Sequence, residues 1–397
     1  MYYETTKELL AFIKKSPTAF HAVEEMQARL TEDGFQVLSE KEHWKLTPGG
    51  KYVVTRNHSA LIAFTIPEKE SWKFHIIASH SDSPSFKIKE NPEIVVEKTY
   101  VKLNVEKYGG MLMAPWFDRP LSIAGRVIVR KDGKLEEKLI DFDRNLVMIP
   151  NLAIHMNREA NSGVSYNPQK DMLPLFSMGG SDVSLQKLLS TQLDVEEKDI
   201  LSHDLFLYNR MEGSIWGAEN EFASSARLDD LQCAFASLKG FLGAQKQDCI
   251  AVHCVLDNEE VGSGTKQGAA STFLKDTLLR INSGLGRTYE EYLMTLADSF
   301  MISADNAHAL HPNYTDKADP VNHPLLNKGI VIKDNANQKY CTDAVSAAVF
   351  KDLCDRADVP WQTFVNRSDI PGGSTLGNIS NTQVPMNTVD IGLPQLS

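Results

Sequence analysis

Three strand-length apolar runs of this chain end directly in acidic residues or histidine. They are FHIIASH before Ser81, IAVHCVL before Asp257 and FMISA before Asp305. Runs of this length, which alternate with helical segments elsewhere in the chain, are typical of a buried sheet in an α/β protein. Ligands of open α/β sheets bind at the carboxyl ends of the strands. The polar groups at these run ends are therefore expected to converge on one site, although they are far apart in the sequence.

The character of the sequence changes in its middle part, where strand-like segments follow one another without helices. Within it, Asp132-Gly133 lies between two such segments and is typical of a β-hairpin turn. Helical and strand patterns alternate on either side of this part. We therefore expect an α/β domain formed by residues 1–90 and 218–397, with an inserted β-rich domain formed by residues 91–217.

Composition excludes two classes of protein. The 397 residues carry 41 Lys and Arg against 52 Asp and Glu, a formal net charge of −11, so a broad footprint on nucleic acid is not expected. No apolar run approaches the roughly 18 residues that a membrane span needs. The N-terminus has acidic residues and no unbroken apolar segment of a secretory signal, and the five cysteines form no C-x-x-C pair. We therefore expect a cytoplasmic protein of about two domains.

Acidic residues and histidine gather in four short clusters. Each cluster alone has a simpler explanation, since an Asp at a helix start is usually a cap, paired glutamates are usually solvated and a lone histidine is usually hydrogen-bonded. Carboxylates that converge on one site, however, repel one another unless a cation neutralises them, so we predict a metal site. The clusters are His80 with Asp82, Asp229 with Asp230 at the start of a helix predicted over 229–242, Glu259 with Glu260, and Asp305.

The ligand types indicate which metal is expected. Imidazole and carboxylates without thiolate suit Zn²⁺, Mn²⁺ or Co²⁺ better than Ca²⁺ or Mg²⁺, and one carboxylate can bridge two ions about 3.5 to 4 Å apart. In an extended strand His80 and Asp82 face the same way, so Asp82 can orient the imidazole. Glu259 and Glu260 point in different directions in extended backbone, so one can bind metal while the other transfers a proton.

Ten stretches of the sequence match the pattern of a known family: SPTAFHA, ASHSDSPSFKIK, IPNLAIHMNR, ARLDD, DNEEVGSG, MISADNAHALHPNY, GIVIKDNANQKY, TDAVS, PGGSTLGNI and DIGLPQLS. On these stretches the sequence resembles the M18 aminopeptidases, a family of di-zinc peptidases that includes aspartyl aminopeptidase. The resemblance rests on stretches that occur in the same order along the chain, from residue 16 to the last residue. It implies a catalytic domain with a mixed sheet and helices on both faces, and an inserted β-rich domain that forms dimers and a lid.

The resemblance also implies roles for individual residues. Glu259 would be the general base, and Asp82 would orient His80. Two zinc ions per subunit are implied, with Mn²⁺ or Co²⁺ as substitutes. The implied ligands are His80 and Asp305 on the first zinc, Asp229 as the bridge, and Glu260 on the second zinc.

Three further residues are implied to contact the substrate. His155, in the inserted domain, would reach the active site of a neighbouring subunit, although a histidine packed at a dimer surface is the simpler explanation. His308 would lie in the substrate site, unless it only makes a hydrogen bond at a helix start. Lys333 is a candidate partner for an acidic substrate side chain, although a lysine at a strand end is usually solvated. The implied homo-oligomer is a closed shell of dimers, a dodecamer.

The sequence departs from the family pattern at its end. Family members continue after Pro-Gln-Leu-Ser with Met-His-Ser, and that histidine is the last ligand of the second zinc. The given sequence ends at Ser397. For protein of this sequence we therefore expect one tightly held metal and a second that binds weakly or not at all.

The favoured hypothesis is a metal-dependent aminopeptidase that removes the N-terminal residue from peptides by attack of a hydroxide that bridges the metals. A preference for N-terminal Asp or Glu is the leading expectation, and a neutral or broader specificity comes second. Two alternatives stay open. One is a catalytically silent or truncated family member that serves as an assembly scaffold, and the other is a two-metal hydrolase of non-peptide amides.

Overall fold

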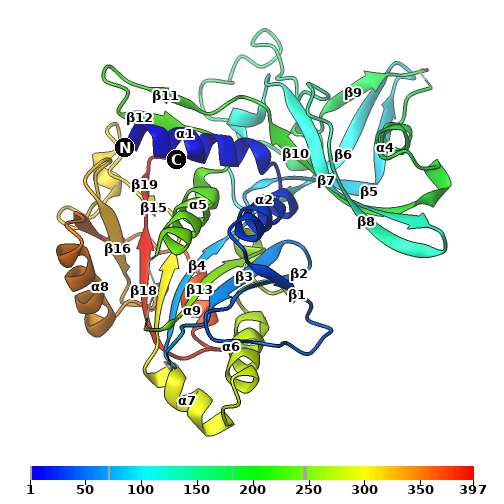
Figure 1. Ribbon diagram of the computed structural model, residues 1–397. Helices are drawn as coiled ribbons and strands as arrows, with labels where there is room; N and C mark the ends of the chain where they lie inside the picture. The colour runs from blue at the N-terminus through cyan, green and yellow to red at the C-terminus, as the bar shows by residue number, and fades with distance from the viewer. Residues whose placement is uncertain (1, 70–71, 181, 245–247) are drawn as a thin grey trace.

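Two large sheets organise the structure, a computed structural model that describes residues 2–69, 72–180, 182–244 and 248–397 (Figure 1). Among these residues the larger sheet has nine strands and the smaller has six. In spatial order, the strands of the larger sheet are β1 (Gln36–Leu38), β2 (Lys51–Arg56), β3 (Ala60–Thr65), β13 (Ile250–Leu256), β4 (Phe74–His80), β14 (Phe300–Ala304), β18 (Asn387–Gly392), β16 (Ile330–Asp334) and β17 (Trp361–Val365).

The centre of the larger sheet is parallel and its flanks are mixed. Strands β13, β4, β14 and β18 are neighbours in that order, and each runs parallel to the next. By contrast, β3 is antiparallel to both β13 and β2, and β16 is antiparallel to β18. The sheet is therefore mixed, as expected. Because β13, β4 and β14 are parallel neighbours, their carboxyl ends lie at one edge of the sheet.

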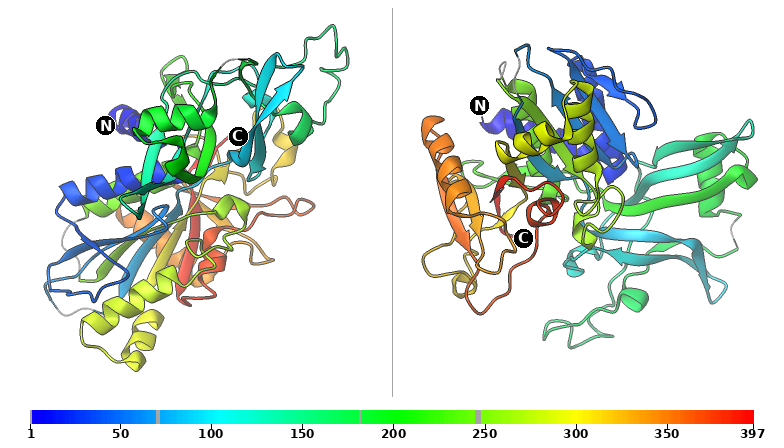
Figure 2. Two further views of the ribbon diagram at one scale, coloured as in Figure 1. Left: turned by 90° about the vertical axis from the view of Figure 1, so that its right-hand side faces the viewer. Right: turned by 90° about the horizontal axis from the view of Figure 1, so that it is seen from below.

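Helices cover both faces of the larger sheet, as expected (Figures 1 and 2). Alternate residues of a strand point to opposite faces: Phe64 of β3 belongs to the core shared with α6, α7 and α9, whereas Ala63 belongs to the core shared with α1, α2 and α5. Within the described residues, no helix combines the length and the apolar character that crossing a membrane requires. The helices are α1 (Tyr2–Lys15), α2 (Ala19–Glu32), α3 (Pro168–Asp171), α4 (Leu185–Leu193), α5 (Leu228–Gly243), α6 (Phe273–Gly284), α7 (Tyr289–Ala297), α8 (Ala344–Arg356) and α9 (Leu376–Ser380).

The smaller sheet is antiparallel in every described pairing and has a core of its own. Asp132 and Gly133 form the predicted hairpin turn, and both have the positive φ that such a two-residue turn requires. Buried apolar side chains of α4 join this core. In spatial order, the strands are β8 (Lys134–Asp141), β7 (Leu121–Lys131), β10 (Ile200–Asn209), β5 (Ser85–Val96), β6 (Tyr100–Tyr108) and β9 (Leu175–Met178).

The chain crosses between the two sheets at the edge where β4 ends. It leaves β4 at His80 and enters β5 at Ser85. Since β5 is continuous from Ser85 to Val96, the predicted boundary at residue 90 falls inside a strand, and the division into two domains stays a prediction. Two short sheets complete the described structure: β11 (Ser214–Trp216) with β12 (Phe222–Ser224), and β15 (Ala307–His308) with β19 (Pro394–Gln395).

The start of α5 differs from the predicted regular helix. Asp229 and Asp230 have non-helical backbone angles, and the peptide bond between them is cis. The side chain of Asp230 accepts a hydrogen bond from the backbone N–H of His80, and Oδ1 of Asp229 faces the imidazole of the same residue. Both carboxylates thus turn toward the end of β4, and their simpler explanation as helix caps is wrong.

Candidate metal centre

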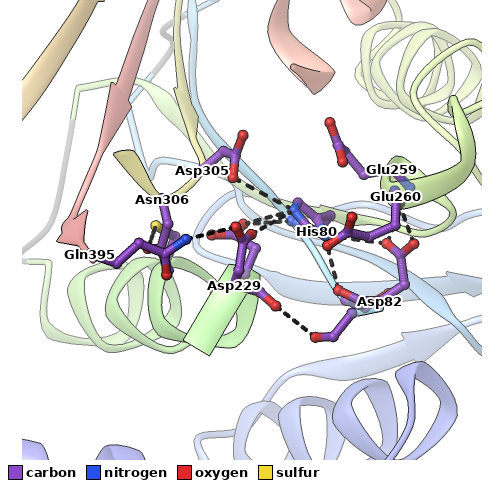
Figure 3. A network of polar contacts seen from close by, with 12 residues as sticks. His80, Asp82, Asp229, Glu259, Glu260, Asp305, Asn306 and Gln395 are labelled. Carbon is purple, nitrogen blue, oxygen red and sulfur yellow. Dashed lines mark hydrogen bonds and ion pairs between the residues drawn. The ribbon is translucent and has the colours of Figure 1, made fainter. Parts of the chain in front are cut away.

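Strand ends and one helix start bring the acidic clusters together at one edge of the larger sheet (Figure 3). His80 is the last residue of β4 and lies in register with Leu256, the last residue of β13. Asp305 follows β14, the parallel neighbour of β4 on the other side. Asp229 lies in the first turn of α5, which packs on β4. These groups meet because their strands are parallel neighbours.

Three carboxylates face the imidazole of His80. Its Nε2 lies 3.5 Å from Oδ1 of Asp229, 3.7 Å from Oδ1 of Asp305 and 4.0 Å from Oδ2 of Asp230. One ligand atom from each of these four residues lies within 4.8 Å of the others. The side chains of His80 and Asp230 are buried, whereas Asp229 and Asp305 are partly accessible. The cluster therefore opens to the outside through Asp229 and Asp305.

The charges of this cluster fit a bound cation. Burial raises the pKa of Asp230 well above its ordinary value, and the nearby charge of Asp305 adds to the effect. Oδ1 of Asp230 is buried and has no hydrogen-bond partner in the described part of the chain. A buried, unpaired carboxylate oxygen among other carboxylates is costly, and a divalent cation would offset that cost. The residues present therefore fit a metal ion.

Asp82 supports the imidazole from its other side. Oδ1 of Asp82 lies 3.2 Å from Nδ1 of His80, so the structure brings together the two residues that the H-x-D spacing predicts to meet. The same oxygen accepts the backbone N–H of Glu259 at 3.1 Å, and Oδ2 accepts that of Glu260 at 3.2 Å. One carboxylate thus connects the end of β4 with the turn after β13.

Glu259 and Glu260 lie on a short 3-10 turn, Glu259–Val261, and not on the extended backbone that we expected. The reason is Asn258, whose φ of 60° turns the chain directly after β13. Their side chains still point in different directions (Figure 3). Burial and the surrounding carboxylates raise the pKa of Glu259 to about 7 and that of Glu260 to about 9. A carboxylate with a pKa near neutrality is suited to accept a proton and return it.

Lys333 is buried beside the cluster, so its simpler explanation as a solvated lysine is wrong. Its side chain is 3% exposed, and its Nζ lies 3.3 Å from Oδ2 of Asp305. Although burial acts in the opposite direction, this ammonium lowers the pKa of Asp305 below its usual range. A cavity of about 120 Å³ opens here, and its lining includes Lys333, His308 and Tyr340 together with Asp229 and Asp305.

A larger cavity of about 970 Å³ lies against both sheets and reaches the same cluster. Its volume lies within the range of ligand sites in proteins. Asp82, Asp229 and Glu260 line it on the side of the cluster, and His308 lines both cavities. Aromatic and basic side chains line other parts of it, among them Phe20, Lys87, Tyr108, Trp116, Arg126 and Phe206.

His155 does not join the cluster of its own chain. It is exposed in the segment between β8 and α3, and among the described residues it lines neither of the two cavities. Its neighbours Leu152, Ile154 and Met156 are also exposed, by 57%, 48% and 75%. A run of exposed apolar side chains is typical of a protein–protein contact.

Three further residues contact the groups of the centre, and the sequence patterns do not predict them as site residues. Asp230 stands out in the sequence only as the neighbour of Asp229. Gln395 donates from Nε2 to Oδ2 of Asp229 at 3.0 Å. The hydroxyl of Tyr108 donates to Oδ2 of Asp82 at 2.7 Å. Gln395 and Tyr108 arrive from elements that only tertiary packing brings near, so no spacing marks them.

The chain is similar to known proteins over almost its whole length. The family described as Aminopeptidase I zinc metalloprotease (M18) matches residues 12–397. A Clostridium acetobutylicum protein named probable M18 family aminopeptidase 2 is 48% identical over 402 residues, which cover 99% of this chain and 93% of that protein. A protein of the same name from Pseudomonas aeruginosa (strain UCBPP-PA14) is 42% identical and covers 99% of this chain and 92% of its own length.

The chain is also similar to solved structures of aminopeptidases. A chain in the cryo-EM structure of the Ape4 and Nbr1 complex has a TM-score of 0.95 at 38% identity, and the match covers 99% of this chain and 80% of that one. A chain of the S. cerevisiae mApe1 dodecamer has a TM-score of 0.86 at 27% identity, and the match covers 100% of this chain and 91% of that one. The mixed α/β fold and the separate antiparallel sheet are thus those of these proteins.

Zinc is expected to stabilise the folded chain strongly. In protein freed of metal by a chelator, the carboxylates around His80 repel one another, and a bound cation removes that repulsion. At a free zinc concentration of about 100 times the Kd, binding contributes about 2.7 kcal/mol, which thermal unfolding detects as a rise in Tm. His80→Ala should lose most of this rise, whereas His75→Ala, at an exposed position of the same strand, should keep it. A wild-type Tm that does not respond to zinc would contradict a metal centre here.

Proposed function

The chain belongs to the M18 family of zinc metallo-aminopeptidases, and we propose that it removes the N-terminal residue, preferentially Asp or Glu, from peptides. The observation that carries this proposal is the convergence of His80 with the carboxylates of Asp229, Asp230 and Asp305 within 4.8 Å of one another. Glu259, on the adjacent turn, adds a group suited to proton transfer. A large cavity beside this cluster offers room for a peptide.

We assign the metal ligands as follows. His80 and Asp305 would hold one zinc, Asp229 would bridge to a second, and Glu260 would bind that second ion, with Mn²⁺ or Co²⁺ as substitutes. When bound, zinc supplies a Lewis acid for the substrate carbonyl and lowers the pKa of water. Asp230 holds the end of β4, because its Oδ2 accepts the backbone N–H of His80 at 3.0 Å.

Glu259 is the proposed general base. It would accept a proton from the attacking water and deliver a proton to the leaving amine, a role that its position on the turn beside the cluster supports. Asp82 positions this base, since its Oδ1 accepts the backbone N–H of Glu259 while it contacts Nδ1 of His80. The imidazole and the base are thereby fixed relative to each other.

The small cavity supports a preference for an acidic N-terminal residue. Lys333 has three N–H donors, and the hydrogen bond found for its Nζ among the described residues goes to Asp305. Two donors are therefore left for the carboxylate of a substrate side chain. His308 lines the same cavity and is exposed there. A volume of about 120 Å³ fits one side chain and excludes a longer segment of peptide.

The exposed segment around His155 supports assembly into dimers and, from these, a dodecamer. We propose that His155 enters the active site of a neighbouring subunit and binds the substrate carbonyl there. Two observations favour this: the apolar neighbours of His155 are exposed, and one similar chain comes from a dodecamer. A cytoplasmic location, proposed from the sequence, is consistent with peptide substrates.

Glu259→Gln should abolish catalysis without loss of metal. Because the amide cannot take up a proton, kcat should fall by on the order of 10³, while zinc content and Tm stay at wild-type values. The matched variant Glu260→Gln, one residue further along the same turn, should instead lose zinc. Stopped assays with an aspartyl anilide, together with metal analysis, distinguish the two. A Glu259→Gln enzyme of near wild-type activity would remove this residue from the role of base.

Lys333→Met should remove the preference for acidic residues. The wild type should hydrolyse aspartyl anilide with a higher kcat/KM than alanyl anilide, and the variant should lower that ratio roughly 10- to 100-fold, the value of a hydrogen bond between charged groups. Lys339→Met, at an exposed lysine nearby, is the control.

The same assays test the alternatives. A wild type that prefers alanyl anilide would contradict the acid preference. A zinc-loaded protein without any peptidase activity would favour a scaffold, and one that cleaves only non-peptide amides would favour the other hydrolase.

Mixed oligomers test His155. Subunits with His155→Ala and subunits with Glu259→Gln should each be inactive, but their mixture should recover activity, because some sites then combine an intact His155 with an intact Glu259 from another subunit. Native mass spectrometry verifies that mixing has occurred. Mixed oligomers without recovered activity would place His155 in its own site or outside catalysis.

A further inference from the structure

The carboxylate of Asp82 has polar neighbours in both sheets, and the imidazole Nδ1 of His80, which lies beside it, is hydrogen-bonded to the backbone oxygen of Asp82 at 3.1 Å. His80, Glu259 and Glu260 contact the carboxylate from the ends of β4 and β13 in the larger sheet. A further contact comes from the smaller sheet, where the hydroxyl of Tyr108, the last residue of β6, donates to Oδ2 at 2.7 Å. This is the shortest of the four contacts. The smaller sheet therefore takes part in fixing Asp82.

We propose that Tyr108 is a positioning residue of the metal centre, which through Asp82 and Asn258 sets the orientation of His80 and of the turn that carries Glu259 and Glu260. The proposal deepens the function proposed above and rests on it only for the effect on turnover. The expected effect of Tyr108 on metal binding follows from the contacts within this chain and does not depend on the proposed function.

The same hydroxyl also holds the turn. It accepts a hydrogen bond from Nδ2 of Asn258 at 2.8 Å. Asn258 precedes Glu259 and is itself fixed, because its Oδ1 accepts from Thr265 at 2.7 Å and from Gln267 at 2.8 Å. The hydroxyl oxygen of Tyr108 thus links Asp82, which orients His80, to Asn258, which precedes the turn.

The backbone directly after Tyr108 passes close to the turn that carries Glu260. Gly109 has a φ of +77°, and a Cβ placed on it would lie 3.0 Å from Cβ of Glu260. A residue with a side chain at this position would push Glu260 away. The chain at the end of β6 therefore contacts the turn through the Tyr108 hydroxyl, and at Gly109 it leaves no room for a side chain next to Glu260.

The ring of Tyr108 is held independently of its hydroxyl. It packs edge-on against Phe206 of β10, with ring centroids 5.6 Å apart and an interplanar angle of 82°. Burial and the charge of Asp82 raise the pKa of Tyr108, so the hydroxyl keeps its proton and stays a donor. Tyr108→Phe thus removes two hydrogen bonds and leaves the ring in place.

Tyr108→Phe is the first test. Partners that orient a metal-binding histidine commonly contribute 10- to 100-fold to metal affinity or activity. We expect zinc affinity, measured by competition with a chelator, to fall about 10-fold or more, and kcat to fall by a similar factor with KM within about twofold. Tyr52→Phe is the control, because it removes a buried hydroxyl that accepts the backbone N–H of Thr47 at 2.9 Å in the larger sheet. It should change neither quantity.

A double-variant cycle separates positioning from a general effect on the fold. Because Asp82→Ala removes the route through Asp82, Tyr108→Phe should lower zinc affinity by a smaller factor in a chain that already carries Asp82→Ala than in the wild type, and the loss that remains belongs to the route through Asn258. A merely structural role would make the two losses multiply. A zinc affinity of Tyr108→Phe within threefold of wild type, or losses that multiply, would overturn the proposal. Zinc binding needs no substrate, so a chain that binds zinc but cleaves no peptide would refute the proposed function and leave this test intact.

Discussion

The contact between one imidazole and three carboxylates is the constraint on which the rest of this structure depends. Nε2 of His80 faces oxygens of Asp229, Asp230 and Asp305 at 3.5 to 4.0 Å, and two of these four side chains are buried. Such a group of anions is unstable by itself in a protein interior. The parallel strands β4 and β14 and the start of α5 hold the carboxylates close together despite this repulsion. A cation, which the cluster fits, would neutralise their charge.

Both sheets are needed to build this centre. The proposed ligands lie at strand ends of the larger sheet and at the start of α5, while the smaller sheet reaches Asp82 through Tyr108, and Gly109 lies close to Glu260. A second contact links the two sheets. Arg126 of β7 donates to Oδ2 of Asp204 in the smaller sheet at 2.8 Å and to the backbone oxygen of Asn57, in the turn between β2 and β3 of the larger sheet, at 3.0 Å. Its guanidinium also lies 4.4 Å from the ring centroid of Phe20 in α2. The orientation of the smaller sheet is therefore coupled to the geometry of the site.

In the proposed function, the two cavities bind different parts of the substrate. The smaller one, beside Lys333 and His308, would select the N-terminal side chain, and the larger one, against both sheets, would hold the rest of the peptide. The two meet at Asp229 and His308, which line both. A peptide bound in this way would have the bond to be cleaved next to the cluster, and the small cavity would hold a single side chain.

The sequence by itself determined the elements and the composition of the centre. Apolar runs that end in His80, Asp257 and Asp305 predict strands whose ends meet, and carboxylates with imidazole but without thiolate predict the class of metal. The resemblance to the family rests on residues along the chain and needs no coordinates. Local chemistry suffices for these conclusions because strand periodicity and ligand type are properties of short segments.

Only the tertiary structure decided how the centre is supported. Tyr108 and Gln395 carry no local signal and reach Asp82 and Asp229 through packing between distant elements. The turned backbone at Glu259 depends on the positive φ of Asn258, which the strand pattern before it does not reveal. Likewise, a lysine at a strand end is usually solvated, but Lys333 is buried, and Asp305, which follows the non-adjacent strand β14, compensates its charge. Burial and charge compensation are properties of the packed molecule, so the sequence alone could not supply them.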